Sequence, residues 1–213
     1  MRLTKLGHAC VRITHDGGTV VIDPGMFTDA EAVDGADVVL LTHEHPDHYD
    51  VDHLRRTDAP VLTIAAVAER IRADAPDVAE RVRVVAPGES FEAAGIPVVA
   101  VGELHAVIHP EMPRFDNSGY TLAVDDVVVH HPGDSLVVPP SPVDVLLVPS
   151  SAPWLKASEA VDYARRVGAR RNVAIHDRIY TEAAHQMLAG HMGRFLSPAG
   201  QEYLRLADGE DLA

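Results

Sequence analysis

The segment His43-Glu44-His45-Pro46-Asp47-His48 concentrates three imidazoles and an aspartate within six residues. It directly follows Ala36-Asp37-Val38-Val39-Leu40-Leu41, a short apolar run that is typical of a buried strand. We therefore expect the histidines on a loop that leaves the carboxyl end of this strand. Pro46 keeps the loop from continuing at once as a helix, and a helix is predicted from about Val51.

Short apolar stretches separated by turn signals continue along the chain. They predict strands at 2–6, 9–14, 19–22, 37–41, 61–63, 82–85, 96–101, 119–124, 127–131, 143–148 and 171–175. Helices are predicted at 65–74 and from about Ser158 to Val167, and helical sequence fills the end of the chain. Strands followed by helices in each half fit a four-layer body, in which two sheets pack face to face and helices cover the outer sides.

The composition narrows the class of protein. The chain has 213 residues, of which 46% are hydrophobic and 23% charged, values that suit one globular domain spanning residues 1–213. No apolar run approaches the ~18 residues that cross a bilayer, and Met1-Arg2-Leu3-Thr4-Lys5-Leu6 lacks the pattern of a signal peptide. We therefore expect a cytoplasmic protein that is not in a membrane.

Charge and cysteine content narrow the partners further. The formal net charge of −14 argues against a nucleic-acid partner, because that affinity comes largely from Lys and Arg that neutralise phosphates. The single cysteine, Cys10, cannot form an internal disulfide, which agrees with a reducing compartment. Any metal ligation therefore falls to histidines and carboxylates, and Cys10 is predicted to be a buried core residue.

Ligand-type side chains follow several of the predicted strands. His105 comes after 96–101, Asp134 after 127–131 and His176 after 171–175, while His8 lies between the first two strands. Loops that leave the same edge of two packed sheets converge, so these residues are expected to meet at one cleft.

The converging residues suggest two neighbouring ion sites. One site would use His43, His45 and His105, and the other Asp47, His48 and His176. Asp134 could bridge the two sites because a carboxylate has two oxygens. Two divalent ions ~3.5–4 Å apart can activate a shared water to hydroxide and stabilise the oxyanion formed when it attacks. We therefore predict metal-assisted hydrolysis, with Asp47 and Asp134 as catalytic residues.

The ordered series His43-x-His45-x-Asp47-His48, His105, Gly133-Asp134 and His176 resembles the motif series of the metallo-β-lactamase fold. The segments Lys5 to Ile13, Val21 to Gly25 and Ala174 to Asp177 resemble more narrowly the small bacterial metal-dependent hydrolases that include ascorbate-6-phosphate lactonase-like proteins. The resemblance implies an α/β fold, a four-layer αβ/βα sandwich of two mixed β-sheets with outer helices and a dinuclear site at one edge. It assigns metal binding to His43, His45, Asp47, His48, His105, Asp134 and His176.

The resemblance also separates branches of the superfamily. The oxygen-reducing di-iron branch typically has a carboxylate where this chain has His45, so His45 favours hydrolysis. The RNA-processing branch carries a large inserted domain for which this chain has no room, and the acidity of the chain agrees with that absence.

Five residues are candidate substrate contacts. The segment 106–118 is irregular, follows a ligand and is expected to border the pocket, so it contributes His109 and Asn117. His8, His131 and Trp154 complete the set. Each of these three has an alternative reading: His8 as a core or turn residue, His131 as a polar strand end, and Trp154 as packing under the following helix.

We expect a hydrolase with two divalent ions, zinc first and manganese or iron as alternatives, acting on an ester, lactone or phosphoester of a small molecule. The other hypothesis is a metal-binding or sensing module without turnover on the same scaffold. Substrate identity and oligomeric state stay open.

Overall fold

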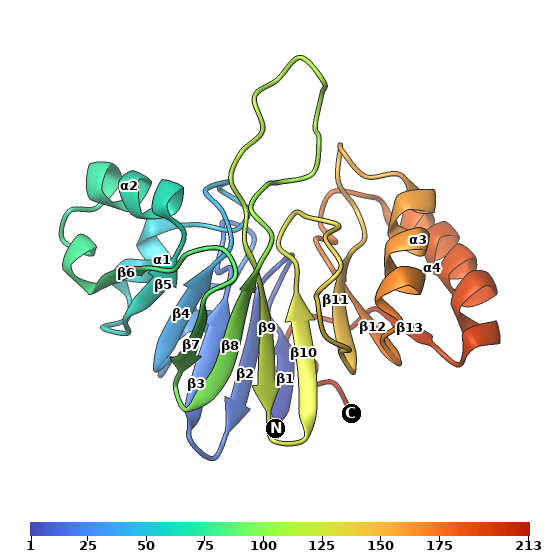
Figure 1. Ribbon diagram of the computed structural model, residues 1–213, viewed down its shortest axis with the longest axis horizontal. Coiled ribbons are helices and arrows are strands. Elements are labelled where there is room, and N and C mark those ends of the chain that lie inside the picture. Colours follow the sequence, from blue (N-terminus) through green and yellow to red (C-terminus); the bar gives the residue numbers. More distant parts are fainter.

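Two β-sheets form the centre of the computed structural model, which describes residues 1–213 (Figure 1). The first sheet comprises β1 (Arg2–Lys5), β2 (Val11–His15), β3 (Gly18–Ile22), β4 (Val38–Leu41), β5 (Val61–Thr63) and β6 (Val82–Val84). The second comprises β7 (Ser90–Ala93), β8 (Ile96–Val101), β9 (Gly119–Val124), β10 (Val127–His131), β11 (Val145–Pro149), β12 (Arg171–Ile175) and β13 (Glu202–Leu204). The helices are α1 (Val51–Arg55), α2 (Ala65–Asp74), α3 (Ala157–Val167) and α4 (Glu182–Leu196), with 3-10 turns η1 (Ala30–Val33), η2 (Ala79–Arg81) and η3 (Ser197–Ala199).

Both sheets are mixed. In the first, β1, β2 and β3 are antiparallel, and β3, β4, β5 and β6 run parallel. In the second, β7, β8, β9 and β10 are antiparallel, and β10, β11, β12 and β13 run parallel. Parallel strands need covered faces, so the outer helices stand over the parallel parts of the sheets.

Three apolar clusters hold the layers together. The largest lies between the sheets and joins Ile22 and Leu40 to Tyr120 and Leu147. Two further clusters pack α1 and α2 on the outer face of β4 and β5, and α3 and α4 on the outer face of β11. A fully buried side chain of this size contributes about 1.5–3 kcal/mol. The four-layer sandwich of two mixed sheets with outer helices is therefore confirmed, and Figure 1 shows the two helix pairs on opposite sides.

Most predicted elements lie where the sequence puts them, and several have the predicted bounds, including α2, β8, β9, β10 and β12. Two strands were not expected. β7 forms a hairpin with β8, and β13 follows α4 in a region predicted as helical. The start of α3 also differs, because Lys156 is its N-cap and the helix begins at Ala157.

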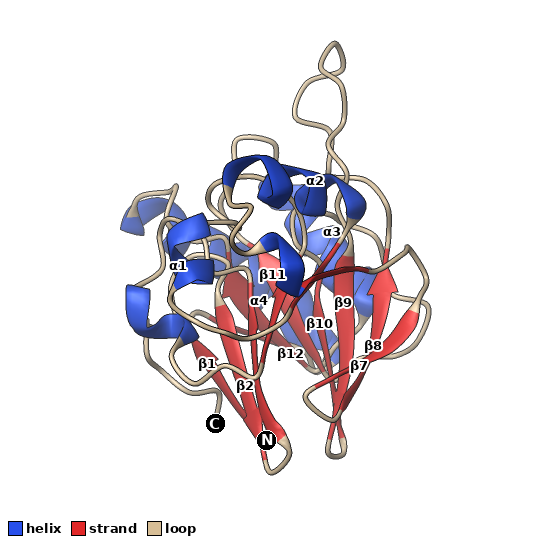
Figure 2. Ribbon diagram, turned by 90° about the vertical axis from the view of Figure 1, so that its left-hand side faces the viewer, coloured by secondary structure: helices blue, strands red, loops and turns tan.

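The ligand-bearing loops lie at one edge of the two sheets. They follow the carboxyl ends of β4, β8, β10 and β12, and the β1–β2 turn joins them there. The β8–β9 loop rises well beyond this edge in both views (Figures 1 and 2). Its foot is tied by an isolated bridge between Leu104 and Asp116. None of the helices has the length and apolar character that spanning a membrane requires.

Candidate metal centre

One group of ligand atoms combines the loop after β4 with the loops after β8 and β10. Its members are His43, His45, His105 and Asp134, whose ligand atoms lie within 4.8 Å of one another. Nε2 of His43 is 3.1 Å from Nδ1 of His45, and Nε2 of His105 is 3.2 Å from Oδ2 of Asp134. The three-imidazole site expected from the sequence is thus brought together, with Asp134 beside it.

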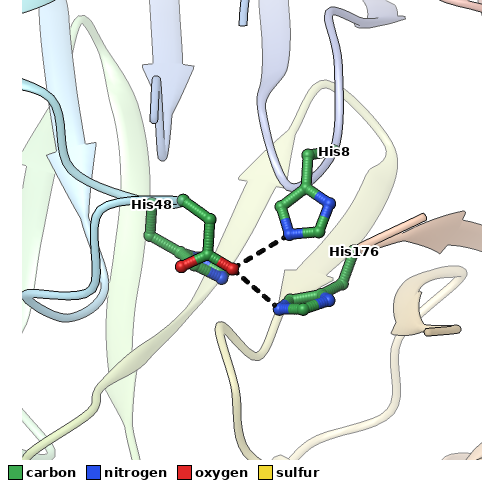
Figure 3. A group of neighbouring side chains, drawn as sticks. His8, His48 and His176 are labelled. Carbon is green, nitrogen blue, oxygen red and sulfur yellow. Dashed lines mark hydrogen bonds and ion pairs between the residues drawn. The ribbon is translucent and has the colours of Figure 1, made fainter. Parts of the chain in front are cut away.

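A second group lies next to the first. Its members are His8, Asp47, His48 and His176, again within 4.8 Å of one another. Oδ2 of Asp47 is 3.1 Å from Nε2 of His8 and 3.2 Å from Nε2 of His176, so both rings point at this carboxylate (Figure 3). His8 joins a group in which the sequence placed only Asp47, His48 and His176 together.

Asp134 connects the two groups. Its Oδ1 lies 3.1 Å from Nε2 of His48, and its Oδ2 lies 3.2 Å from Nε2 of His105 and 3.2 Å from Nε2 of His176. The carboxylate is 1% exposed, so these nitrogens and not water surround it. This is the position that a carboxylate shared by two cations requires.

Hydrogen bonds outside the cluster fix how the rings are turned. Nδ1 of His48 donates to Asp23, Nδ1 of His105 to the carbonyl oxygen of Ala106, and Nδ1 of His176 to the carbonyl oxygen of Ser151. In the neutral ring, a proton on Nδ1 leaves Nε2 with its lone pair. Each Nε2 therefore faces the centre as an acceptor, as metal-binding histidines commonly do.

Nε2 of His43 also keeps its lone pair, because Thr42 links Nδ1 of this ring to Asp23. The hydroxyl of Thr42 donates to Oδ2 of Asp23 at 2.6 Å, so it has no second proton to give. Thr42 Oγ1 lies 3.0 Å from Nδ1 of His43 and therefore accepts from it. Nε2 of His43 is left free for a cation.

Asp23 is a functional residue that the sequence analysis missed. It accepts from the Thr42 amide at 2.8 Å, from the Thr42 hydroxyl and from Nδ1 of His48 at 2.7 Å, and it is fully buried. The signal was present, because Asp23 follows β3 just as the other ligand-type residues follow their strands. In the sequence, Asp23 stood out only as part of the segment Val21 to Gly25 that carries the family resemblance.

The cluster fits divalent cations on its own chemistry. Nε2 of His48 and Oδ1 of Asp134 are buried and have no hydrogen-bond partner. Lone pairs of several imidazoles converge on a carboxylate, an arrangement that is costly unless positive charge lies between them. Histidine and carboxylate donors in this number suit zinc, manganese or iron.

The pKa values of the cluster residues also reflect the close packing of imidazoles and carboxylates. Burial lowers the pKa of His8 to about 4 and holds the pKa of His43 well below its ordinary value. At His176 burial acts in the same direction, but the Asp134 and Asp47 carboxylates outweigh it and raise the pKa to about 9. For Asp134 itself, the neighbouring His48 and His176 overcome burial and keep the pKa well below its usual range. The carboxylates thus stay ionised and attract positive charge.

Two glycines allow the ligand-bearing loops to lie close to their neighbours. Gly133 has φ +61°, and a Cβ there would lie 2.4 Å from Oδ1 of Asn117 and 2.6 Å from Oγ1 of Thr42. A Cβ on Gly25 would lie 2.1 Å from the backbone of Asp47. Glycine at these positions lets Asp134 and the loop after β4 sit at their observed places.

Two of the five candidate substrate contacts are engaged elsewhere. Asn117 is buried, accepts from the Asp134 amide at 2.9 Å and donates to the carbonyl oxygen of Pro132. His131 is buried, with Nε2 2.9 Å from the Ala9 carbonyl oxygen and Nδ1 accepting from the Gly133 amide. The expected substrate contacts of Asn117 and His131 are therefore corrected: all their polar atoms are taken by the backbone that shapes the site.

The other three candidates have different surroundings. His109 is exposed on the β8–β9 loop, where Nδ1 accepts from the Glu111 amide. Trp154 donates through Nε1 to Oδ2 of Asp134 at 3.1 Å and also packs against the α3 and α4 cluster, as its alternative reading expected. A substrate contact of Trp154 stays a prediction. Nδ1 of His8 accepts from the Arg178 amide, which leaves the proton on Nε2 for Asp47.

Comparison with known proteins agrees with this geometry. The family described as "Beta-lactamase superfamily domain" matches residues 2–176. Protein Rv0786c of Mycobacterium tuberculosis is 39% identical over 198 residues, covering 90% of this chain and 91% of the relative. A UPF0173 metal-dependent hydrolase of Methanoregula boonei is 30% identical, covering 86% of this chain and 85% of the relative.

The fold has solved counterparts. The metallo-beta-lactamase fold protein YhfI from Bacillus subtilis superposes with a TM-score of 0.74 at 15% identity, covering 99% of this chain and 98% of that chain. The expected fold family is confirmed, whereas the narrower likeness to lactonase-like proteins stays a prediction. The chain belongs to the beta-lactamase superfamily and is a metal-dependent hydrolase with the metallo-β-lactamase fold.

Proposed function

We propose that this chain hydrolyses an ester, lactone or phosphoester of a small molecule with two divalent ions held side by side. His43, His45 and His105 would hold one ion, Asp47, His48 and His176 the other, and Asp134 both. The observation that carries the proposal is the contact of the Asp134 carboxylate with nitrogens of both groups, at 3.1 and 3.2 Å.

The ions supply one part of the chemistry: bound cations lower the pKa of a coordinated water and polarise the substrate oxygen under attack. The side chains of the two groups would position the water and the ions. Asp47 is the ligand carboxylate with access to solvent, since its side chain is 20% exposed while that of Asp134 is 2% exposed. Asp47 would therefore orient the attacking water, and Asp134 would hold both ions.

The residues around Asp47 keep it ionised for this task. The neighbouring rings of His176 and His8 outweigh burial and hold the pKa of the Asp47 carboxyl far below its usual range. An ionised carboxylate accepts hydrogen bonds only, so it can receive one from a water but cannot donate. No side chain is needed as a covalent nucleophile, because the water is the attacking group.

The donor set favours zinc and also accepts manganese or iron. Cys10 is fully buried and belongs to neither group of ligand atoms, so thiolate chemistry does not select the metal. A small-molecule substrate is proposed because the ligand side chains are largely buried, on loops at the sheet edge from which the long β8–β9 loop also leaves.

Metal content and turnover test the proposal together. Protein purified without added metal should contain up to about two equivalents of divalent metal per chain. Its hydrolysis of carboxylic esters, lactones and phosphodiesters should stop with chelator and return with Zn²⁺ or Mn²⁺. Undetectable metal with no binding on titration would refute the proposal.

Two variants assign the activity to the cluster. His45→Ala and Asp134→Ala should abolish turnover while the fold is largely kept, because these residues lie on loops and not in the apolar cores. His191→Ala on the exposed side of α4 is the matched control and should retain activity. Unchanged activity in both cluster variants would contradict the assignment.

A further inference from the structure

Aromatic rings enclose the metal centre. The chain has four phenylalanines and one tryptophan, and three of these five stand against the cluster. The Phe27 ring centroid lies 5.1 Å from that of His8, the Phe115 centroid 4.4 Å from that of His45, and the Trp154 centroid 5.5 Å from that of His105. In a chain with only 5% aromatic residues, this concentration gives the ligands apolar walls.

Exposed apolar side chains gather on the same loops. Eight of the chain's fourteen exposed large hydrophobic residues lie on three loops beside the cluster, and we name them the apolar rim. They are Met26, Phe27, Leu104, Val107, Ile108, Met112, Ile179 and Tyr180. Large apolar side chains on the surface are costly unless something covers them, and such patches mark binding sites.

The three loops are tied to the metal centre itself. The Met26 amide donates to the Pro46 carbonyl oxygen in the histidine loop, at 2.8 Å. Leu104 precedes His105 directly, and the Ala106 amide donates to the Asp134 carbonyl oxygen at 2.7 Å. The Ile179 amide donates to the hydroxyl of Ser151, whose carbonyl oxygen holds His176. The loops that carry the apolar rim are thus hydrogen-bonded to the loops that carry the ligands.

The same loops offer little to an anion. Their two arginines are engaged: Arg114 donates to the His105 carbonyl oxygen, and Arg178 pairs with Asp208. Acidic side chains of the β8–β9 loop, including Glu103 and Glu111, are exposed beside the apolar rim. A strongly charged phosphate would find the ions but no free arginine or lysine on these loops, whereas an uncharged apolar group would find exposed apolar side chains.

We infer that the substrate is a carboxylic ester, thioester or lactone whose uncharged alkyl or aryl group packs on the apolar rim while its carbonyl lies at the metal centre. This inference rests on the proposed function and narrows it. Burial of each added CH₂ on such a surface favours binding by about two- to fourfold.

A substrate series with one scissile bond tests the inference. The zinc-loaded protein is assayed with p-nitrophenyl acetate, butyrate, hexanoate and octanoate, with the mono-p-nitrophenyl ester of glutaric acid and with bis-p-nitrophenyl phosphate. We expect kcat/KM to rise about two- to fourfold per CH₂, mainly through KM, and the charged ester to fall at least tenfold below hexanoate. A flat series, or preference for the charged ester or the phosphodiester, would overturn the inference while leaving the proposed hydrolase function intact.

Substitutions in the apolar rim test whether these residues cause the dependence of kcat/KM on chain length. Phe27→Ser and Ile108→Ser should flatten the chain-length dependence, whereas Phe27→Leu should keep it. Val84→Ser is the matched control, since Val84 is 41% exposed on the edge strand β6, and it should behave as wild type. If the serine variants changed the oligomeric state on gel filtration but not the chain-length dependence, the apolar rim would cover a second copy and the inference would fall.

A binding measurement keeps the test independent of turnover. Trp154 is the only tryptophan and touches Asp134, so its fluorescence reports on ligands at the centre. Titration of the zinc-loaded protein with n-alkyl hydroxamic acids of two to eight carbons should give dissociation constants that fall with length, and less steeply in Phe27→Ser. Constants independent of length would reject the inference even if every ester were hydrolysed slowly. Absence of both metal and hydrolysis would instead reject the proposed function.

Discussion

Oδ2 of Asp23 lies 2.7 Å from Nδ1 of His48, and both side chains are fully buried. Asp23 stands at the end of β3, and His48 lies on the loop after the neighbouring strand β4. The carboxylate also accepts two hydrogen bonds from Thr42, so it receives three in all. It is therefore the anchor that turns both His48 and, through Thr42, His43 toward the centre.

Asp23→Asn should weaken metal binding by about 10- to 100-fold, because an amide cannot accept from three donors as a carboxylate does. Zinc affinity measured by competition with a chromogenic chelator tests this expectation. Asp37→Asn is the matched control, since Asp37 also accepts a backbone amide hydrogen bond, from Thr19, but lies outside the cluster. Equal affinities in the two variants would show that Asp23 does not orient the ligands.

Gly133→Ala should cost both stability and metal binding. The positive φ alone costs about 1–2 kcal/mol for a residue with a Cβ, and contacts of 2.4 and 2.6 Å with Asn117 and Thr42 add to it. Gly200→Ala has a similar φ of +74° in open space and serves as the control. In urea unfolding, Gly133→Ala should lose clearly more free energy than Gly200→Ala, and it alone should lose zinc affinity; equal losses would remove the role given to the close approach.

His130 should make the folded state sensitive to acid. It is fully buried, and burial lowers its pKa from the ordinary 6.5 to about 3. The unfolded chain then binds a proton below pH 6.5 that the folded chain does not bind until about pH 3. The resulting stability is complete above pH 6.5 and is lost as the pH falls toward 3, at about 1.4 kcal/mol per pH unit.

His130→Asn removes this contribution. Between pH 7 and pH 5 the wild type should lose about 2 kcal/mol more free energy of unfolding than the variant. Urea unfolding at the two pH values, in metal-free protein for both chains, measures the difference. The same pH dependence in both chains would show that His130 is protonated equally in the folded and unfolded states.

Removal of the metal should lower the unfolding temperature and alter the fluorescence of Trp154. A ligand that binds only the folded state at 100 times its dissociation constant adds about 2.7 kcal/mol. Trp154 donates to Oδ2 of Asp134, so the emission of its ring should respond when a cation leaves. Thermal unfolding followed by intrinsic fluorescence, before and after dialysis against chelator, measures both effects; a chelated sample that unfolds like the untreated one would contradict the expectation.

The sequence contained enough to predict the sandwich, because buried strands such as β8 and β12 are short apolar runs bounded by turn signals. Edge strands were harder to predict. β7 pairs only with β8, and its sequence, Ser90-Phe91-Glu92-Ala93, carries little apolar pattern. The signal that could have found it is the two-residue turn Ala94-Gly95, in which both residues have positive φ as hairpin turns prefer.

The ligand candidates were predictable for a different reason. His43, His105, Asp134 and His176 each follow a strand, and loops at one sheet edge converge whatever their sequence. Hydrogen bonds between these loops could not be predicted, because they depend on how two sheets are placed against each other. Asn117 and His131 illustrate this: each has the chemistry of a substrate contact but is occupied by backbone groups from another loop.

The amide of Arg178 donates to Nδ1 of His8 across 170 positions of sequence, and the amide of His176 donates to the carbonyl oxygen of His8. A ribosome releases His8 long before its partners exist, so the emerging chain carries its histidines on separate, unfinished loops. Contacts of such long range raise the contact order of the fold and slow its folding. The full set of ligand atoms is thus assembled only when the first and last strands of the chain have both found their places.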